Sequence, residues 1–174
     1  MRYIFILAMF LTSLFAADYS FIVKEEILQE RMRQEFPITE KTMFLTFHVK
    51  DPKLSLDGKR QRFNFTATLQ LPDVRDTKGR AASAVVSFSS RIAYSKGGNL
   101  YLRKIKVTDI KSDLIGESMK GMLYGTLESA LNEYYKSRAI YSLKNEKGIV
   151  GQAVKAIKNV VIVDEGIKII FGQL

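Results

Sequence analysis

The most regular pattern in the chain is the run RFNFTATLQL at residues 62–71. From Phe63 onward its odd positions are apolar and its even positions are polar, which is the two-residue period of a strand with one buried face. The same alternation recurs at residues 84–94 and, less regularly, at 43–49 and 100–110. Because strands of about 10 residues are roughly twice the usual length, we predict a long, curved antiparallel sheet.

The segment at residues 100–110 changes parity near its middle. Leu100 and Leu102 are apolar residues at even positions. Ile105 and Val107 are apolar residues at odd positions. One extra residue would return both pairs to the same face of the sheet, so we predict a β-bulge at the Arg103-Lys104 step between them.

Helical periodicity appears on either side of the predicted sheet. Apolar residues recur at steps of three and four over residues 113–136, which predicts one long amphipathic helix. Shorter helices are predicted at residues 24–36 and at 149–158, followed by a hairpin with Asp164-Glu165-Gly166 as its turn, in which the glycine supplies a positive φ. We therefore expect an α+β fold in which the curved sheet wraps around the long helix, with a short N-terminal helix and a C-terminal helix and hairpin.

The first residues of the chain indicate export. Arg2 precedes an almost wholly apolar stretch at residues 3–15, which is shorter than the about 20 residues of a membrane-spanning helix. We predict a signal peptide over residues 1–16 and a single domain over residues 17–174. Because no Cys follows the apolar stretch, the mature protein is expected to be periplasmic and not lipidated.

The composition argues against most kinds of enzyme. The 174 residues contain no Cys and one His, His48. Thiol nucleophiles and thiolate metal sites are therefore excluded, and so is a metal site with two or three His ligands. His48 falls on the polar side of its predicted strand, as a surface residue would. We predict a protein that is not an enzyme and that has no metal or cofactor.

Positive charge is concentrated in the predicted sheet. Residues 50–111 contain 14 Lys and Arg and 5 Asp, whereas the rest of the chain after residue 16 contains 12 basic and 13 acidic residues. An anionic membrane surface or an envelope protein is a candidate partner, since each basic residue near an anionic membrane contributes about 1 kcal/mol. A solvated face that discourages edge pairing is the alternative. Nucleic acid is not expected as the partner of an exported protein. The residues assigned to this basic surface are Arg60, Arg62, Arg91, Lys104 and Lys106.

The order of the segments resembles the YceB-like bacterial envelope proteins. The resemblance rests on FIVKEEI at residues 21–27, LESALNEYY at 127–135, AIYSL at 139–143 and the closing apolar hairpin at 160–171. It implies a tubular lipid-binding (TULIP-like) fold, in which a long sheet wraps a long helix and encloses an apolar groove. The chain departs from the typical member by lacking the lipidated Cys.

The apolar faces of the sheet and the long helix permit either a dry core or a groove that opens for an acyl chain. The first reading of function is an exported protein that binds a lipid or another hydrophobic small molecule between helix and sheet. The alternative is a non-enzymatic envelope interaction protein with a filled core and a basic sheet surface. The residues assigned to the apolar groove are Phe63, Phe65, Leu69, Phe88, Ile92, Ile115, Met119, Met122, Leu123 and Leu127.

Overall fold

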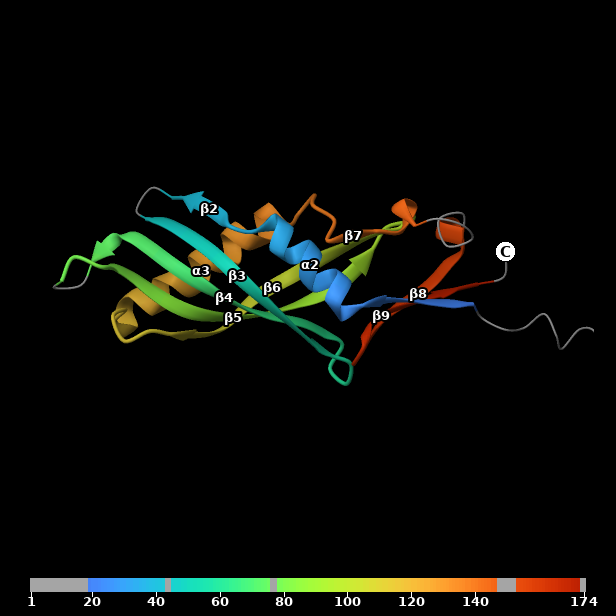
Figure 1. The fold of residues 1–174 in the computed structure, drawn as a ribbon, viewed down its shortest axis with the longest axis horizontal. Coiled ribbons are helices and arrows are strands. Elements are labelled where there is room, and N and C mark those ends of the chain that lie inside the picture. The colour runs from blue at the N-terminus through green and yellow to red at the C-terminus, as the bar shows by residue number, and fades with distance from the viewer. Residues whose placement is uncertain (1–18, 43–44, 76–77, 147–152, 173–174) are drawn as a thin grey trace, which may run out of the picture.

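A six-stranded antiparallel sheet with the strand order β2-β3-β4-β5-β6-β7 dominates the computed structural model (Figure 1). The structure describes residues 19–42, 45–75, 78–146 and 153–172, so the predicted signal peptide lies outside the described residues. The long strands of this sheet have 12 to 14 residues, so each is longer than the segment predicted for it. The strands are β2 (Ile38–Lys41), β3 (Thr46–Asp57), β4 (Arg62–Arg75), β5 (Ala81–Tyr94), β6 (Asn99–Lys111) and β7 (Tyr141–Ser142).

A smaller sheet with the order β1-β9-β8 lies at one end of the elongated molecule (Figure 1). Its strands are β1 (Ser20–Lys24), β8 (Ile157–Val163) and β9 (Gly166–Phe171). Strand β1, which opens the described chain, was not predicted. Within the described part of the segment predicted as a C-terminal helix, residues 153–158, the chain forms a 3-10 turn, Ala153–Ala156, and then enters β8. A second 3-10 turn, Leu143–Asn145, follows β7.

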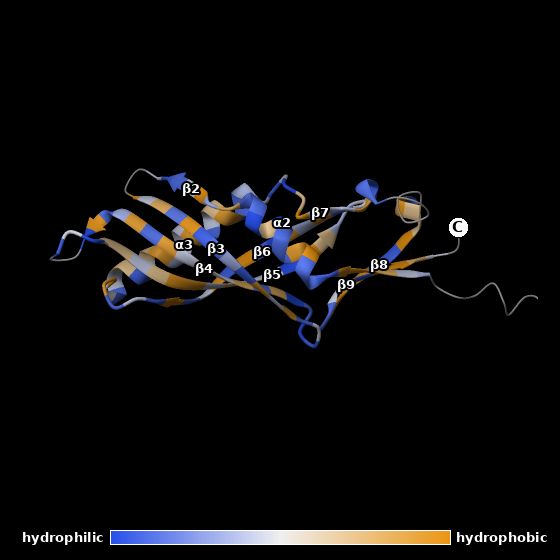
Figure 2. Cartoon of the chain, viewed as in Figure 1, coloured by the Kyte–Doolittle hydropathy of each residue, from blue (hydrophilic) through white to orange (hydrophobic). Residues whose placement is uncertain are grey.

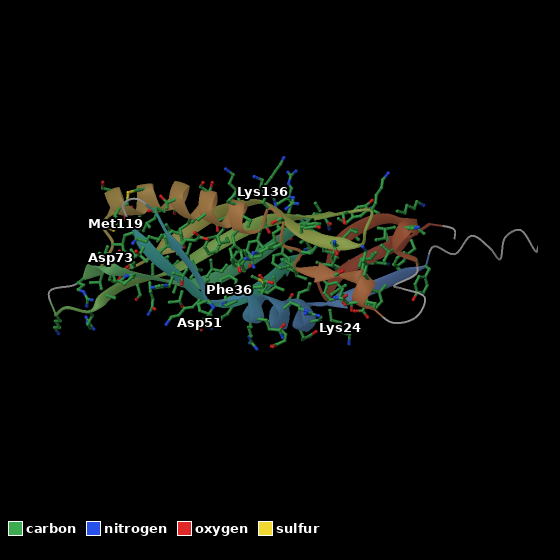
Figure 3. All side chains as sticks on the ribbon, turned by 90° about the horizontal axis from the view of Figure 1, so that it is seen from above. Lys24, Phe36, Asp51, Asp73, Met119 and Lys136 are labelled. Atoms are coloured by element: carbon green, nitrogen blue, oxygen red, sulfur yellow. The ribbon has the colours of Figure 1, made fainter. Side chains whose placement is uncertain are left out.

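Two α-helices pack against the large sheet, α2 (Glu25–Glu35) on β3 and α3 (Glu117–Tyr134) on β6. Figure 3 shows them at opposite sides of the molecule, with Met119 on α3 and Lys24 just before α2. Each helix buries a narrow stripe of side chains. The buried residues are Leu28 and Met32 in α2, and Leu123, Leu127 and Leu131 in α3.

The predicted architecture of one sheet wrapped around one long helix is wrong. The described residues instead form two antiparallel sheets, and α3 lies along β6 with its outer face uncovered. Apolar residues of α3 recur every three or four positions, but the buried ones are Leu123, Leu127 and Leu131, which lie four positions apart. Met122 is 47% exposed, and Gly121 and Gly125 have no neighbouring atom within 4 Å of where a Cβ would stand. The period shows that the helix is amphipathic but overstates how much of its surface is covered.

Alanine at Gly121 or Gly125 is expected to stabilise the protein. Both residues are exposed in the interior of α3, where glycine costs about 1 kcal/mol relative to alanine and where a methyl group would meet nothing. Gly121→Ala and Gly125→Ala should each raise the free energy of unfolding in urea by about 0.5 to 1 kcal/mol. A loss of stability in either variant would show that something covers this face in solution.

The predicted β-bulge in β6 is confirmed. Ser89 pairs with Lys106 and Arg91 pairs with Arg103, so one residue of β5 faces two residues of β6. Lys104, at the bulge, has a φ of 54°. The apolar residues on both sides of the bulge, Leu100, Leu102, Ile105 and Val107, are all buried. The bulge therefore keeps both halves of β6 on the core, as the parity change requires.

Three side-chain amides bind the open edges of strands. In α3, Asn132 accepts a hydrogen bond from the Ile105 N–H at 3.0 Å and donates one to the Ile105 carbonyl at 2.8 Å. In the β3–β4 turn, Gln61 makes the same two bonds, both 2.8 Å long, with the backbone of Ile162 in β8. In α2, Gln29 bonds the Pro52 carbonyl and the Leu54 N–H of β3 at 2.8 and 2.7 Å. Each amide takes the place of a neighbouring strand at that point of the edge.

The hairpin of β8 and β9 turns at Asp164-Glu165, with Val163 paired to Gly166. Gly166 does not have the predicted positive φ; among the described glycines, that conformation occurs at Gly79 and Gly98. Gly166 instead pairs with Lys24 of β1, and a Cβ on it would collide with the carbonyl group of Val23. The glycine is required there because the two backbones approach closely, and not because of its φ.

Candidate functional site

The residues assigned to an apolar groove lie mostly in a packed core. Figure 2 shows the alternating hydropathy of the long strands, whose apolar side forms this core. Ile92 and Met119 are half-buried at its margin, whereas Met122 is exposed on the outer face of α3. If the core held a hollow wide enough for an acyl chain, the side chains that line it would be accessible to a water-sized sphere. The other assigned residues are at most 3% exposed: Phe63, Phe65, Leu69, Phe88, Ile115, Leu123 and Leu127.

An open hollow lies on the opposite, polar face of the large sheet. It is an open groove of about 640 Å³ over β3, β4, β5, β6 and the β3–β4 turn. Residues of α3 line neither this groove nor the four other principal cavities of the described residues. We call it the basic groove; its polar lining residues are Lys53, Ser55, Asp57, Arg60, Arg62, Asn64, Thr66, Ser87, Ser89, Lys106 and Thr108.

The strand register arranges the floor of the basic groove in rows across the sheet. In one row, Asn64 of β4 pairs with Ser55 of β3 and with Ser89 of β5. Ser89 pairs in turn with Lys106 of β6. Successive residues of a strand face opposite sides, so these side chains share the face opposite the buried Phe65. The floor is therefore made of short hydroxyl and amide side chains, with a cation at one end of the row.

A second row lies two residues further along each strand. Thr66 of β4 pairs with Lys53 of β3 and with Ser87 of β5. Rows on the same face of a sheet are about 7 Å apart, since each residue advances the strand by 3.3 to 3.4 Å. Lys53 therefore stands at the end of the groove that is farther from the β3–β4 turn.

Arginines occupy the third row, next to the β3–β4 turn. Arg62 pairs with Asp57 of β3. Arg62 and Arg91 each lie one position beyond the Phe63–Ser90 pair, which is the last pair of β4 and β5 at this end of the sheet. A second hollow, of about 300 Å³, adjoins the groove at this row and shares Arg60 and Arg62 with it. Its remaining lining residues are Gln61, Arg91, Ile92, Val160 and Ile162.

Two cations of the basic groove have carboxylate partners. Arg60 lies 3.9 Å from Asp57, and the Arg60 side chain is 83% exposed. Lys106 lies 3.4 Å from Glu128 of α3, whose other oxygen accepts a hydrogen bond from the Val107 N–H. Exposed ion pairs of this kind contribute about 0 to 1 kcal/mol, so both cations can exchange their partner for another anion.

The other cations of the site are uncompensated. Lys53, Arg62 and Arg91 form no ion pair or side-chain hydrogen bond with any of the described residues. Arg103, by contrast, donates a hydrogen bond to the Tyr135 carbonyl at 3.1 Å and stacks over the Tyr101 ring. The arginine row thus contains two positive charges that form no ion pair or ring contact with a described residue, although Asp57 is the backbone partner of Arg62.

The structure brings together most of the basic residues predicted from charge. Arg60, Arg62 and Lys106 line the basic groove, and Arg91 lines the hollow beside it. Lys104 is exposed at the bulge and lines neither. Lys53 was missed because the strand predicted at residues 43–49 stops before it. The alternation of polar and apolar residues from Lys53 to Asp57 was the signal that could have revealed it.

Comparison with models of known protein families gives no match, and comparison with curated proteins gives none either. The resemblance to YceB-like proteins therefore stays a prediction, while the tubular fold that it implied is not the one observed. Among the described residues, no three His, Cys, Asp or Glu side chains are placed to hold a metal ion. No helix in the same residues is long and apolar enough to span a membrane.

Proposed function

We propose that this protein is a non-enzymatic binding protein that holds an anionic partner in the basic groove. The observation that carries the proposal is the set of uncompensated cations, Lys53, Arg62 and Arg91, on one face of the large sheet. The groove is lined by β3 to β6 and their first turn, so both packed helices leave this face open. A cleft of one sign of charge concentrates oppositely charged ligands.

The chemistry of the lining favours binding over catalysis. Its side chains are mainly hydrogen-bond donors and cations. The one carboxylate of the lining, Asp57, accepts a hydrogen bond from the Arg60 N–H at 2.9 Å and pairs with the Arg60 guanidinium. A general acid and base need two titrating groups in contrasting environments. The lining supplies attraction and orientation for an anion instead.

We further propose that the protein acts in the periplasm, where the predicted signal peptide would deliver it. Envelope surfaces that it would meet there are anionic, and each basic residue held near such a surface contributes about 1 kcal/mol. The packed core gives no support to a lipid chain held between helix and sheet, so binding is assigned to the sheet surface.

A salt-dependent binding assay tests this proposal. Fluorescein-labelled dextran sulfate, a flexible polyanion, is titrated with the protein and followed by anisotropy at increasing NaCl. Lys53→Gln combined with Arg62→Gln removes two uncompensated cations from the groove. We expect saturable binding by the wild type that weakens with salt, and a loss of at least about tenfold in the variant, since each charged hydrogen bond contributes about 1.5 to 3 kcal/mol.

The matched control is Lys41→Gln combined with Lys144→Gln. Both lysines are exposed, lie outside the groove and its neighbouring hollow, and make no ion pair with a described residue. The control removes the same net charge and should leave the affinity nearly unchanged. Equal losses in the two double variants would show that net charge alone attracts the polyanion, and would overturn the proposal.

A further inference from the structure

We propose that the ligand of the basic groove is a phosphate ester of a polyol or sugar, with its phosphate held between Arg62 and Arg91 and its hydroxyl groups over the floor. This inference rests on the proposed function and adds the chemical class of the ligand. Two independent observations support it, the arginine pair and the polar floor beside it.

The arginine pair brings two positive charges to one place on the sheet. Like charges close together on neighbouring strands repel each other. Arg62 and Arg91 lie at the ends of β4 and β5 and line one hollow, and Asp57, the backbone partner of Arg62, forms its ion pair with Arg60. The planar fork of a guanidinium matches two oxygens of a phosphate, so two adjacent guanidinium groups can bind three or four oxygens of one phosphate group.

The floor next to this pair offers unused hydrogen-bonding groups. Asn64, Thr66, Ser87 and Ser89 are half-buried, and their side chains form no hydrogen bond with a described residue. Ser90, one residue away on the buried face, is satisfied by the Phe63 carbonyl at 3.1 Å. Hydroxyl and amide groups both donate and accept hydrogen bonds, which suits a ligand that carries hydroxyl groups.

The spacing of the rows places the polar floor directly beside the arginine pair. Asn64 and Ser89 lie one row, about 7 Å, from the arginine row on the same two strands. A phosphate between the arginines would place the group that it esterifies over Asn64 and Ser89. The ester oxygen and the neighbouring hydroxyl groups would then meet side chains that have no other partner.

A nucleic acid also carries phosphates and sugars, but the groove lacks what holds its bases. Proteins that bind single strands stack the bases on exposed aromatic rings. The two aromatic residues of the lining, Phe65 and Phe88, are 1% exposed and stack on each other, with ring centroids 4.6 Å apart. The groove therefore favours a small phosphorylated polyol over a polynucleotide.

Displacement of labelled dextran sulfate by small molecules tests the inference. The competitors are glucose 6-phosphate, inorganic phosphate, glucose and a single-stranded DNA 12-mer at equal ionic strength. We expect glucose 6-phosphate to compete at about tenfold lower concentration than inorganic phosphate, because its hydroxyl groups add hydrogen bonds to the floor, and glucose alone to have no effect. Competition should weaken from pH 7.5 to pH 5, because the second phosphate pKa is about 6.

Variants separate the two parts of the site. Asn64→Ala combined with Ser89→Ala should bring glucose 6-phosphate down to the level of inorganic phosphate while dextran sulfate binding persists. Ser83→Ala, an exposed serine of the same strand β5, is the control and should change neither. Arg91→Gln should weaken phosphate competition by about tenfold and at the same time raise the melting temperature, because it relieves the repulsion between the arginines.

Vesicles distinguish the source of the phosphate ester. Phosphatidylinositol and phosphatidylserine vesicles of equal charge density are compared in a sedimentation assay. Preferential binding to phosphatidylinositol assigns a lipid headgroup, and competition by glucose 6-phosphate without vesicle binding assigns a soluble ester. Dextran sulfate binding without any preference for glucose 6-phosphate over inorganic phosphate would overturn this inference and leave the proposed function standing. Stronger competition by the DNA 12-mer would also overturn it, and absence of dextran sulfate binding would overturn both.

Discussion

Replacing Gly166 by alanine is expected to destabilise the protein by at least about 3 kcal/mol, the upper end of what overpacking usually costs. A Cβ at this position would collide with the Val23 carbonyl group, which belongs to the backbone of β1 and cannot rotate away. Either β1 or the hairpin must move, and the pairing of Lys24 with Gly166 is lost. Thermal unfolding should show a melting temperature lower by about 6 to 12 °C, since 1 kcal/mol corresponds to 2 to 4 °C in a domain of this size.

Gly121→Ala is the matched control, because the same methyl group is added there in open space. The two substitutions should shift the melting temperature in opposite directions. A Gly166→Ala protein as stable as the wild type would mean that β1 does not pack against the hairpin as described.

Replacing Asn132 by leucine is expected to cost about 2 to 4 kcal/mol. The amide of Asn132 satisfies the N–H and the carbonyl of Ile105 at the bulge, and it also donates to the Glu128 carbonyl at 2.7 Å. Leucine has a similar shape but leaves the polar backbone of Ile105 without partners, and each unsatisfied group costs about 1 to 3 kcal/mol. Urea denaturation measures the loss, and hydrogen exchange should be faster at the Ile105 amide.

Asn145→Leu provides the comparison for this change. Asn145 is exposed in a 3-10 turn, and its side chain bonds none of the described residues. It should lose less than about 0.5 kcal/mol, as substitutions at ordinary surface positions do. Equal losses in the two variants would assign the effect to leucine itself rather than to the broken contact at the bulge.

The long strands and the bulge could be predicted because their signals are local. Alternation within one strand identifies its buried face, and a parity change at Arg103-Lys104 identifies the extra residue. The packing of α3 could not be predicted in this way. The spacing of apolar residues such as Met119 and Met122 is the same whether the sheet buries a broad face of the helix or a single stripe. How much of the helix is buried depends on contacts between residues that are distant in the sequence. Strand β1 is too short for its period to be recognised.

The cations of the site could be predicted from the distribution of charge along the sequence, but the groove that they line could not. Arg62 and Arg91 are 29 positions apart in the sequence and become neighbours only through the β4–β5 register. The polar floor follows from the same register, since Asn64 and Ser89 come from different strands. A single sequence shows that such residues face away from the core, whereas their arrangement into rows depends on strand pairing.

The pairing of β1 with β9 also sets the order in which the protein can fold. Ser20 pairs with Ile170, so the small sheet joins the first and the last described strands. Strands β3 to β6 form consecutive hairpins and can assemble early, whereas contacts of such long sequence separation form slowly. While a ribosome still holds the last strand, the apolar residues of β1 have no strand to pair with. The small sheet is therefore expected to form late, once β9 is free to pair with β1.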